Sequence, residues 1–426
     1  MSKTFRSWDV DQSWLLPPSV HEFVPVGHPA HFVRDTVREV LDLSAITRTY
    51  DVDRGQPPYH PGMMVALLLY GYSRGVYSSR RLAQACEERV DFMAVTGLNR
   101  PDFRTISDFR LRHLTALSDL FVQVLRLCQS AGLVKLGHVA VDGTKLKANA
   151  SRHKAMSYGR MKQSEPKLAA EVEAWLKAAE AQDAAEDAEY GAGLRGDETP
   201  DWMADKQTRL ARIRQAMAEL EAEAASDPAD EDPQGPGASS GMQDHGKRKK
   251  TPDGGPPDKA QRNFTDPDSR IQPTRDGFIA GYNGQIAVDA ALVPLVDQAR
   301  VNLRRKLREV SGDSGFATED NLAAMAERKI RAYLPPARSQ RNPAHAASPQ
   351  AVAKRPRMSA MAATLKRAGH RSRYRLRKQV VEPVFGQIKQ ARGFRQHLLR
   401  GLDKVRAEWA MICTVHNLLK LAKATG

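Results

Sequence analysis

Three acidic residues, far apart in the chain, stand where they could hold divalent cations. Asp142 follows the apolar run HVAV, Asp313 follows the run REVSG, and Glu382 lies in the predicted helix YRLRKQVVEPVFGQIK. Two carboxylates at the ends of adjacent strands, with a third on a helix packed against the sheet, would form a cage of hard oxygen ligands that suits two magnesium ions. One ion would lower the pKa of a water for in-line attack on a phosphodiester, and the other would stabilise the leaving oxygen.

Each acid taken alone also has an ordinary structural explanation. The Asp142-Gly143 pair is a common turn sequence, and a glutamate on a basic helix is usually a surface ion pair. The interpretation as a metal site therefore requires that all three side chains converge in the folded protein.

Positive charge surrounds the third acid. Offsets of four, four and seven residues place four side chains on one face of the predicted helix: Tyr374, Lys378, Glu382 and Lys389. The whole chain of 426 residues has 65 Lys or Arg against 50 Asp or Glu, a formal net charge of +15. This excess favours a polyanionic partner, and nucleic acid is the first candidate. The alternative for the helix itself is that it is basic and merely solvated.

Two other classes of protein are disfavoured by the sequence. The longest strongly apolar run, around residues 63–69, is far shorter than the roughly 20 residues that a membrane-spanning helix needs. The first residues have acids and no apolar stretch before a cleavage site, so they do not resemble a secretory signal. We therefore expect a cytoplasmic protein without membrane contact, whose three cysteines are reduced core residues.

The elements that must position the acids divide the chain into two predicted domains. Residues 1–132 have the apolar spacing of helices, and Ser78, Ser79 and Thr105 are candidate N-caps of two short basic helices. A helix-turn-helix of this kind could bind DNA, with these side chains available to phosphates: Arg80, Arg81, Arg104, Arg110 and Arg112. The alternative is a helical bundle whose charges are solvated.

Residues 133–426 are predicted to form an α/β domain with two interruptions. Ala-, Glu-, Lys- and Arg-rich sequence at residues 160–225 predicts a helical hairpin insertion, and the Pro- and Gly-rich segment 226–262 predicts a disordered linker. Strands are expected around HVAV, DGFIAGYNGQIAVDA, REVSG and IRAYLP, and a long helical region is expected from 371 to 423.

Five blocks of sequence resemble those of insertion-sequence transposases with an RNase H-like DDE domain: YHPGMMVALLLYGYSRGVYSSRRLA, GHVAVDGTKLKANASRHKAMSYGRM, DPDSRIQPTRDGFIAGYNGQIAVD, GDSGFATEDNL and VVEPVFGQIKQARGFRQHLLRGLDKVRAEW. The resemblance implies an RNase H-like mixed sheet flanked by helices, a mainly helical N-terminal domain and a helical hairpin insertion. It implies that Asp142, Asp313 and Glu382 are catalytic and hold Mg²⁺ or Mn²⁺. The side chains expected to contact DNA beside them are Tyr374, Arg377, Lys378, Lys389, Arg392 and Arg395.

Such a protein would act in the bacterial cytoplasm at the nucleoid, as a homodimer on double-stranded DNA. It would bind the terminal inverted repeats of its own element, cut a strand and join the freed 3′ hydroxyl to target DNA, which is transposition by DNA recombination. Between residues 290 and 312 the chain lacks a strand that its relatives carry, and we expect this loss to leave the next helix at the wrong end of the sheet. The alternatives are a catalytically inactive DNA-binding relic and an RNase H-like nuclease acting on branched DNA.

Overall fold

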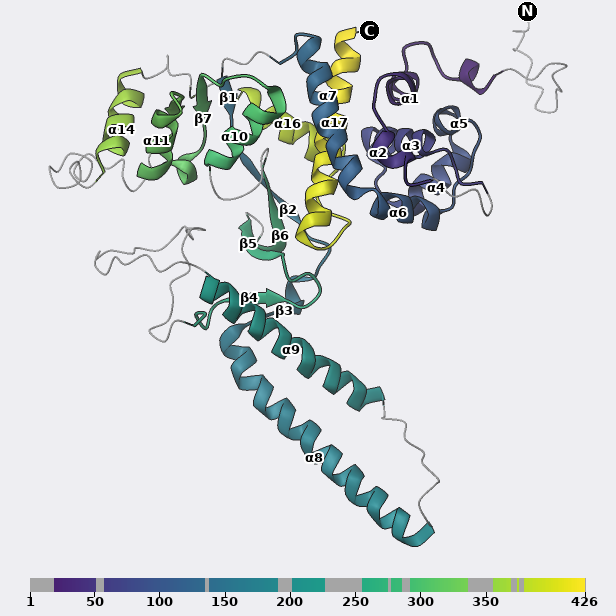
Figure 1. Ribbon diagram of the computed structural model, residues 1–426, viewed down its shortest axis with the longest axis vertical. Coiled ribbons are helices and arrows are strands. Elements are labelled where there is room, and N and C mark those ends of the chain that lie inside the picture. Colours follow the sequence, from purple (N-terminus) through teal and green to yellow (C-terminus); the bar gives the residue numbers. More distant parts are fainter. Residues whose placement is uncertain are drawn as a thin grey trace, which may run out of the picture. The chain divides into compact units, whose positions relative to one another are not determined.

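The computed structural model describes residues 19–50, 57–134, 138–190, 201–226, 255–274, 277–285, 292–335, 355–368, 374 and 379–425 (Figure 1). In these residues the protein is a mixed α/β protein, rich in helix, with three small sheets. It divides into two compact units, Met1–Val134 with Trp409–Gly426, and Lys135–Glu408. No helix in the described part of the chain is both long enough and apolar enough to cross a bilayer.

The first unit is helical, as predicted. Its described residues before Val134 form the 3-10 turn η1 (Val20–Phe23) and then these helices: α1 (Pro29–Glu39), α2 (Ser44–Thr47), α3 (Pro61–Ser73), α4 (Ser79–Glu88), α5 (Val90–Thr96), α6 (Phe103–Arg112) and α7 (Leu114–Ser130). Helix α3 is apolar on all sides, and Tyr70 and Tyr72 are fully buried. A helix without a polar face must be surrounded, and α1, α4 and α5 pack against it.

The helix starts in this unit differ from the predicted ones. Asp102 caps α6, because its Oδ1 accepts from the backbone N–H groups of Arg104 (2.6 Å) and Thr105 (3.2 Å). Thr105 lies inside the helix and donates its hydroxyl to the Asp102 carboxylate (2.8 Å). The prediction of Thr105 as the N-cap was therefore wrong, since the helix begins earlier and Asp102 accepts from its first free backbone N–H groups. Ser78 does precede α4, but its side chain makes no capping hydrogen bond.

The second unit contains the two sheets that matter for the predicted site. In one, β1 (His138–Ala140) pairs in parallel with β7 (Glu309–Ser311), and β7 pairs in parallel with β8 (Arg331–Tyr333). In the other, β2 (Gly143–Lys147) pairs antiparallel with β6 (Gly277–Gln285), which pairs antiparallel with β5 (Arg270–Thr274). Only Val141 and Asp142 separate β1 from β2. The predicted mixture of parallel and antiparallel strands is therefore present, divided over two sheets that meet at Asp142.

Helices cover the parallel sheet. Residues of α10 (Leu292–Leu303) and α11 (Glu319–Glu327), together with Met358 of α14 (Pro356–Ala368), form one apolar cluster with Val310 of β7. Among the described residues, α10 is the only element between β6 and β7. Residues 286–291, which precede α10, lie outside the described part. Strand β7 nevertheless pairs in parallel with β1. The expectation of a missing strand before α10 stays a prediction, because residues 286–291 lie outside the described part, but α10 packs in the core with residues beside both strands.

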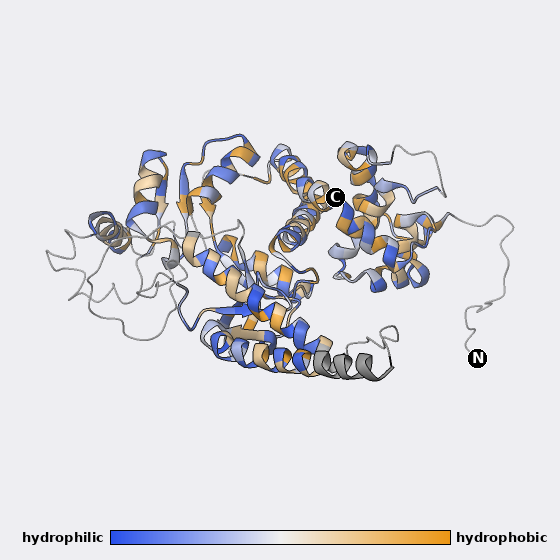
Figure 2. Cartoon of the chain, turned by 60° about the horizontal axis from the view of Figure 1, so that its bottom comes forward, coloured by the Kyte–Doolittle hydropathy of each residue, from blue (hydrophilic) through white to orange (hydrophobic). Residues whose placement is uncertain are grey.

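The predicted helical insertion is present. Helices α8 (Tyr158–Tyr190) and α9 (Asp201–Ser226) lie side by side as a hairpin, with the two-stranded sheet β3 (Ala155–Ser157) and β4 (Gln261–Asn263) at its base (Figure 1). Both helices carry bands of hydrophilic and hydrophobic residues (Figure 2). Tyr158, Met161, Ile213 and Leu220 are buried between them, which gives the hairpin its own small core.

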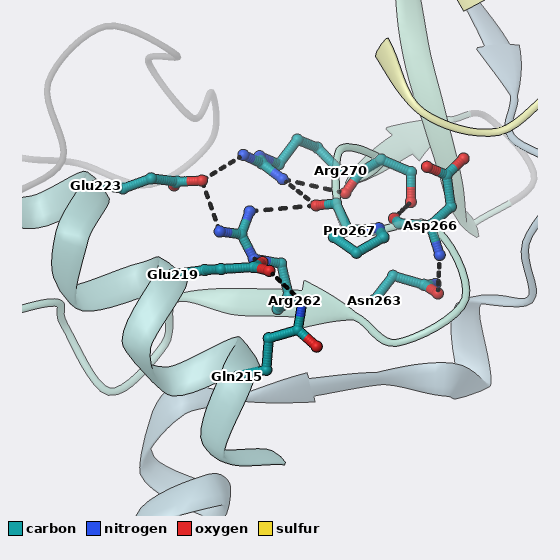
Figure 3. Close-up of polar contacts among 9 residues, drawn as sticks. Gln215, Glu219, Glu223, Arg262, Asn263, Asp266, Pro267 and Arg270 are labelled. Carbon is teal, nitrogen blue, oxygen red and sulfur yellow. Dashed lines mark hydrogen bonds and ion pairs between the residues drawn. The ribbon is translucent and has the colours of Figure 1, made fainter. Parts of the chain in front are cut away.

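The prediction of a disordered linker over residues 226–262 is wrong at its C-terminal end. Residues 227–254 lie outside the described part, but 255–262 are described and lead into β4. Arg262 is 4% exposed, with its Nε 3.2 Å from Glu219 Oε2 and its terminal nitrogen 2.7 Å from Glu223 Oε1 (Figure 3). A buried guanidinium needs such partners. This polar stretch is ordered because its charge is paired with α9, a contact that composition does not reveal.

The predicted helical region from 371 to 423 is broken. Helix α16 (Glu382–Gly386) continues as the π-helical turn η7 (Gln387–Ala391), and α17 (Leu402–Thr425) begins only after a ten-residue connection. Gly393 and Gly401 in this connection have φ angles of 71° and 84°, which side chains other than glycine adopt at a cost. The connection runs beside β2, where His397 N donates to the Lys147 carbonyl (2.8 Å).

Candidate active site

Asp142 and Asp313 lie at matching positions at the ends of two paired strands. Ala140 of β1 faces Ser311 of β7, and Val141 N donates to the Ser311 carbonyl (2.7 Å), so the pairing extends one residue beyond β1. Each aspartate stands two residues beyond this pair of residues. Because parallel strands end at the same edge of a sheet, both carboxylates come to one edge, and both residues are half-buried.

Backbone groups orient these two carboxylates. Asp142 Oδ1 accepts from Gly143 N, and Asp313 Oδ1 accepts from Gly315 N, each at 2.9 Å. Asp313 thereby caps the 3-10 turn η3 (Ser314–Phe316). A β-carbon on Gly143 would come within 2.7 Å of Asn283 Oδ1. A side chain at this position would require the Asn283 amide to shift, so that amide lies next to this edge.

Glu382 is the first residue of α16 and is exposed. Among the described residues, no three His, Cys, Asp or Glu side chains lie close enough together to hold a metal ion. The strand pairing thus brings Asp142 and Asp313 to a common edge, whereas Glu382 does not join them in a metal-binding group in this conformation. The donor chemistry of the two aspartates, hard carboxylate oxygens, fits Mg²⁺ or Mn²⁺.

Lys389 contacts β2 close to Asp142, and its seven-residue spacing from Glu382 did not predict this contact. From Gln387 the backbone follows a π-helical turn, so the seven-residue offset no longer has α-helical geometry throughout. Lys389 Nζ donates to the carbonyl of Lys145 in β2 (2.7 Å), three residues after Asp142. Burial, and then the charge of Arg395, lower the pKa of Lys389. The amine is therefore engaged with the backbone in this conformation.

The other cations predicted beside Glu382 are only partly described. Arg377 and Lys378 lie outside the described residues, and Tyr374 is half-buried. Arg395 is exposed, and its guanidinium donates to the Lys389 carbonyl (3.2 Å) and to the Gln390 side chain. Arg392 is half-buried and donates to the Gln387 carbonyl (3.5 Å). Among the described cations of this set, Arg395 is the most exposed.

Four of the five predicted N-terminal arginines are exposed, namely Arg80, Arg81, Arg104 and Arg112, and two of them share an aromatic ring. The guanidinium carbons of Arg80 on α4 and Arg104 on α6 lie 5.1 Å and 5.7 Å from the centroid of the Phe103 ring. Phe103, itself 37% exposed, was not predicted from the sequence, because an isolated aromatic residue at a helix start is more often a core residue. The ring holds two cations on one surface of the unit.

Arg110 has a different role from the one predicted. It is 6% exposed and donates to Tyr72 Oη (3.2 Å), the Tyr77 carbonyl (3.1 Å) and Ser79 Oγ (3.3 Å). It therefore ties α6 to α3 and to the start of α4. Contrary to the expectation from sequence, its guanidinium is not available to a phosphate in this conformation, and we leave it out of the DNA-contacting set.

Two segments of the chain match models of known families. Residues 18–112 match a model described as "Transposase domain (DUF772)", and residues 338–422 match one described as "Transposase DDE domain". No curated protein and no solved structure matches the chain. Of the three predicted acids, Glu382 lies inside a matched segment, whereas Asp142 and Asp313 lie between the two.

The first match lies in the helical N-terminal unit, and the two matches together cover less than half of the chain. Both support the resemblance of this chain to insertion-sequence DDE transposases.

Proposed function

We propose that this protein is a transposase that binds the terminal inverted repeats of its own element as a homodimer, cleaves a DNA strand and transfers the freed 3′ end to target DNA. The observation that supports the proposal best is the matched position of Asp142 and Asp313 beyond the paired residues of β1 and β7. In the proposed arrangement the two sheets that meet at Asp142 are the two halves of an RNase H-like sheet.

Asp142 and Asp313 would hold Mg²⁺ or Mn²⁺, with Glu382 as the third ligand. Bound cations would supply an activated water and neutralise charge at the leaving oxygen. Because Glu382 is exposed at the start of α16, it completes the set in a conformation in which α16 approaches β1 and β7. We expect DNA binding to favour that conformation. Asn283, beside Gly143, would orient a phosphate oxygen or a water at this edge.

Exposed cations on both units would bind the DNA backbone. On the first unit, Arg80, Arg81 and Arg104 would contact phosphates. On the second, Arg395 is accessible, and we propose the same role for Tyr374, Arg377, Lys378, Lys389 and Arg392. Lys389 would first have to release the Lys145 carbonyl.

The proposal is tested with purified protein and a labelled duplex carrying the element's end sequence, in Mg²⁺ and in Mn²⁺. The wild type is expected to nick this duplex and not a scrambled one. Asp142→Asn, Asp313→Asn and Glu382→Gln are each expected to lose at least about 100-fold in nicking rate with unchanged DNA affinity, because removal of a catalytic group costs on that order. Asp320→Asn, an exposed acid on α11, is the matched control and should keep full activity.

A second candidate is a transposase relic that binds DNA without cutting it. It is favoured by the exposure of Glu382 and by the absence, among the described residues, of any three-membered acidic metal group. The same assay separates the two. Sequence-specific binding by the wild type without nicking in either metal supports the relic, whereas nicking abolished by Asp142→Asn rules it out.

A further inference from the structure

A strongly basic cavity lies at the end of the parallel sheet opposite the two aspartates. It has a volume of about 710 Å³ and is lined by six cations: Arg300, Arg305, Lys306, Arg308, Arg328 and Lys329. Glu327 is the one acid among its lining residues. A concave surface with this excess of one charge raises the local concentration of oppositely charged ligands.

The position of the cavity separates it from the predicted cutting site. Arg308 directly precedes β7, and Lys329 and Ile330 directly precede β8, whereas Asp313 follows the other end of β7. Five residues of nearly extended chain span roughly 17 Å. Successive phosphates of one DNA strand advance about 3.4 Å along the duplex axis. On a duplex running along β7, a phosphate in the cavity would thus lie about five nucleotides from a phosphate at cations bound by Asp313.

Most of the positive charge in the cavity is uncompensated within the described residues. Arg328 and Arg300 share Asp297, at 2.9 Å and 3.4 Å. By contrast, none of the remaining four cations pairs with a described acid, and all four are exposed: Arg305, Lys306, Arg308 and Lys329. Cations held close together repel one another unless an anion lies among them.

The backbone around the cavity is also unusual. Arg304 and Lys329 have φ angles of 49° and 56°, which side chains other than glycine rarely adopt. Each occupies a connection that leads into a strand, and the two connections are joined where Arg331 N donates to the Arg308 carbonyl (2.9 Å). Both residues lie just after a helix, and at Lys329 the backbone N–H groups of Lys329 and Ile330 donate to the carbonyls of Ala326 and Met325, so the left-handed residue ends α11. These two conformations hold the RRKLR and RKIR segments around one space.

We propose that this cavity binds the sugar-phosphate backbone of double-stranded DNA outside the cut site, as a second contact that holds flanking or target DNA. The inference rests on the proposed function, because it assumes a DNA substrate. Duplex DNA suits this surface because its backbone supplies several phosphates that the exposed Arg and Lys side chains can contact. Its binding would be independent of base sequence and strongly salt-dependent.

The test compares two triple variants of the full chain. Arg305→Gln, Lys306→Gln and Lys329→Gln are combined in one, and Lys167→Gln, Arg209→Gln and Arg212→Gln, exposed cations of α8 and α9, are combined in the control. The affinity for a duplex of random sequence is measured over a range of salt concentrations. Each phosphate contact contributes about 0.9 to the slope of log K against log salt, so the cavity variant should lose about 2 to 3 from the slope and at least about tenfold in affinity at low salt. The control should change little.

Four outcomes would overturn the inference. One is an unchanged slope in the cavity variant, and another is an equal loss in the control, which would indicate a general charge effect. In the third, the cavity variant binds the duplex as the wild type does but no longer binds inorganic pyrophosphate in calorimetry. The cavity would then be a site for a small phosphate compound and not for DNA. The fourth is absence of duplex binding by the wild type, which would also remove the proposed function. Wild-type binding with an unaffected cavity variant would remove this inference alone. Far-UV circular dichroism melting verifies that both variants are folded.

Discussion

Asp142 and Asp313 each stand two residues beyond Ala140 and Ser311, which face each other across the parallel strands β1 and β7. Their proximity in the fold therefore follows from a backbone register, and it does not depend on the insertion α8–α9 that separates them in the chain. A shift of that register by one residue would turn one of the two side chains to the other face.

If the two aspartates share a cation, metal binding should stabilise the folded protein. A ligand at 100 times its dissociation constant adds about 2.7 kcal/mol to the free energy of unfolding. Adding Mg²⁺ or Mn²⁺ should therefore raise the melting temperature of the wild type and of Asp320→Asn, but not of Asp142→Asn or Asp313→Asn. Equal shifts in all four proteins, measured by differential scanning fluorimetry, would place the metal elsewhere.

Arg110 should matter for stability. Arg110→Met would leave Tyr72 Oη, the Tyr77 carbonyl and Ser79 Oγ without their donor, at a cost of roughly 2 to 4 kcal/mol in the free energy of unfolding. Arg112→Met, on the same helix but exposed, should cost less than about 0.5 kcal/mol. Urea denaturation followed by circular dichroism measures both. Similar stability of the two variants would contradict a structural role for Arg110.

Arg262 should hold the helical hairpin to its base. Arg262→Met would remove the buried partner of Glu219 and Glu223, which we expect to cost roughly 2 to 4 kcal/mol, since the two glutamates are partly solvated. Arg270 shares Glu223 but is half-exposed, so Arg270→Met should have a much smaller effect. Limited proteolysis should cut α9 faster in Arg262→Met than in the control. Identical digestion patterns would refute the anchoring role.

Tyr158 predicts how the stability of this hairpin depends on pH. Burial, and the hydrogen bond that Tyr158 donates to Glu221 (2.6 Å), raise the pKa of its phenol to about 12. A raised pKa in the folded state stabilises the protein fully below the unfolded value of about 10, and this contribution is lost as pH rises through about 12. The wild type should therefore lose stability between pH 10 and 12 more steeply than Tyr158→Phe. Parallel curves from urea titrations at several pH values would count against this assignment.

Arg80 and Arg104 test whether the first unit contacts DNA. Replacing both with Gln should lower the salt dependence of duplex binding by about 2 in slope, because two phosphate contacts would be lost. Arg38→Gln with Arg48→Gln, two exposed cations of the same unit, is the matched control. Phe103→Leu should have a weaker effect, since the ring positions the two guanidinium groups without carrying charge. An equal change in the control would mean that the Phe103 surface has no special role.

Patterns within short segments were enough to predict much of the architecture. The apolar spacing before Ala131, the helix-forming composition of residues 160–225 and the apolar runs before Asp142 and Asp313 predicted helices and strands that are present. Turn chemistry also predicted that each aspartate would follow a strand. These features depend on periodicity and local propensity, which neighbouring residues determine.

Burial and pairing between distant segments could not be predicted in this way. Arg110 and Arg112 look alike in the sequence, and only the packing of α3, α4 and α6 buries the first. Arg262 lies in a segment whose composition predicts disorder, yet two glutamates of α9 order it. The basic cavity combines cations from before β7 and before β8.

The sequence by itself determined the charge excess, the helical and strand-forming segments, and the three acids that the family resemblance implied. Only the tertiary structure decided that β1 pairs with β7 in the register that brings Asp142 and Asp313 to one edge, and that Glu382 is exposed at the start of α16. The physical reason is that propensities act between neighbours in the chain, whereas register and burial depend on contacts between segments that are remote in sequence.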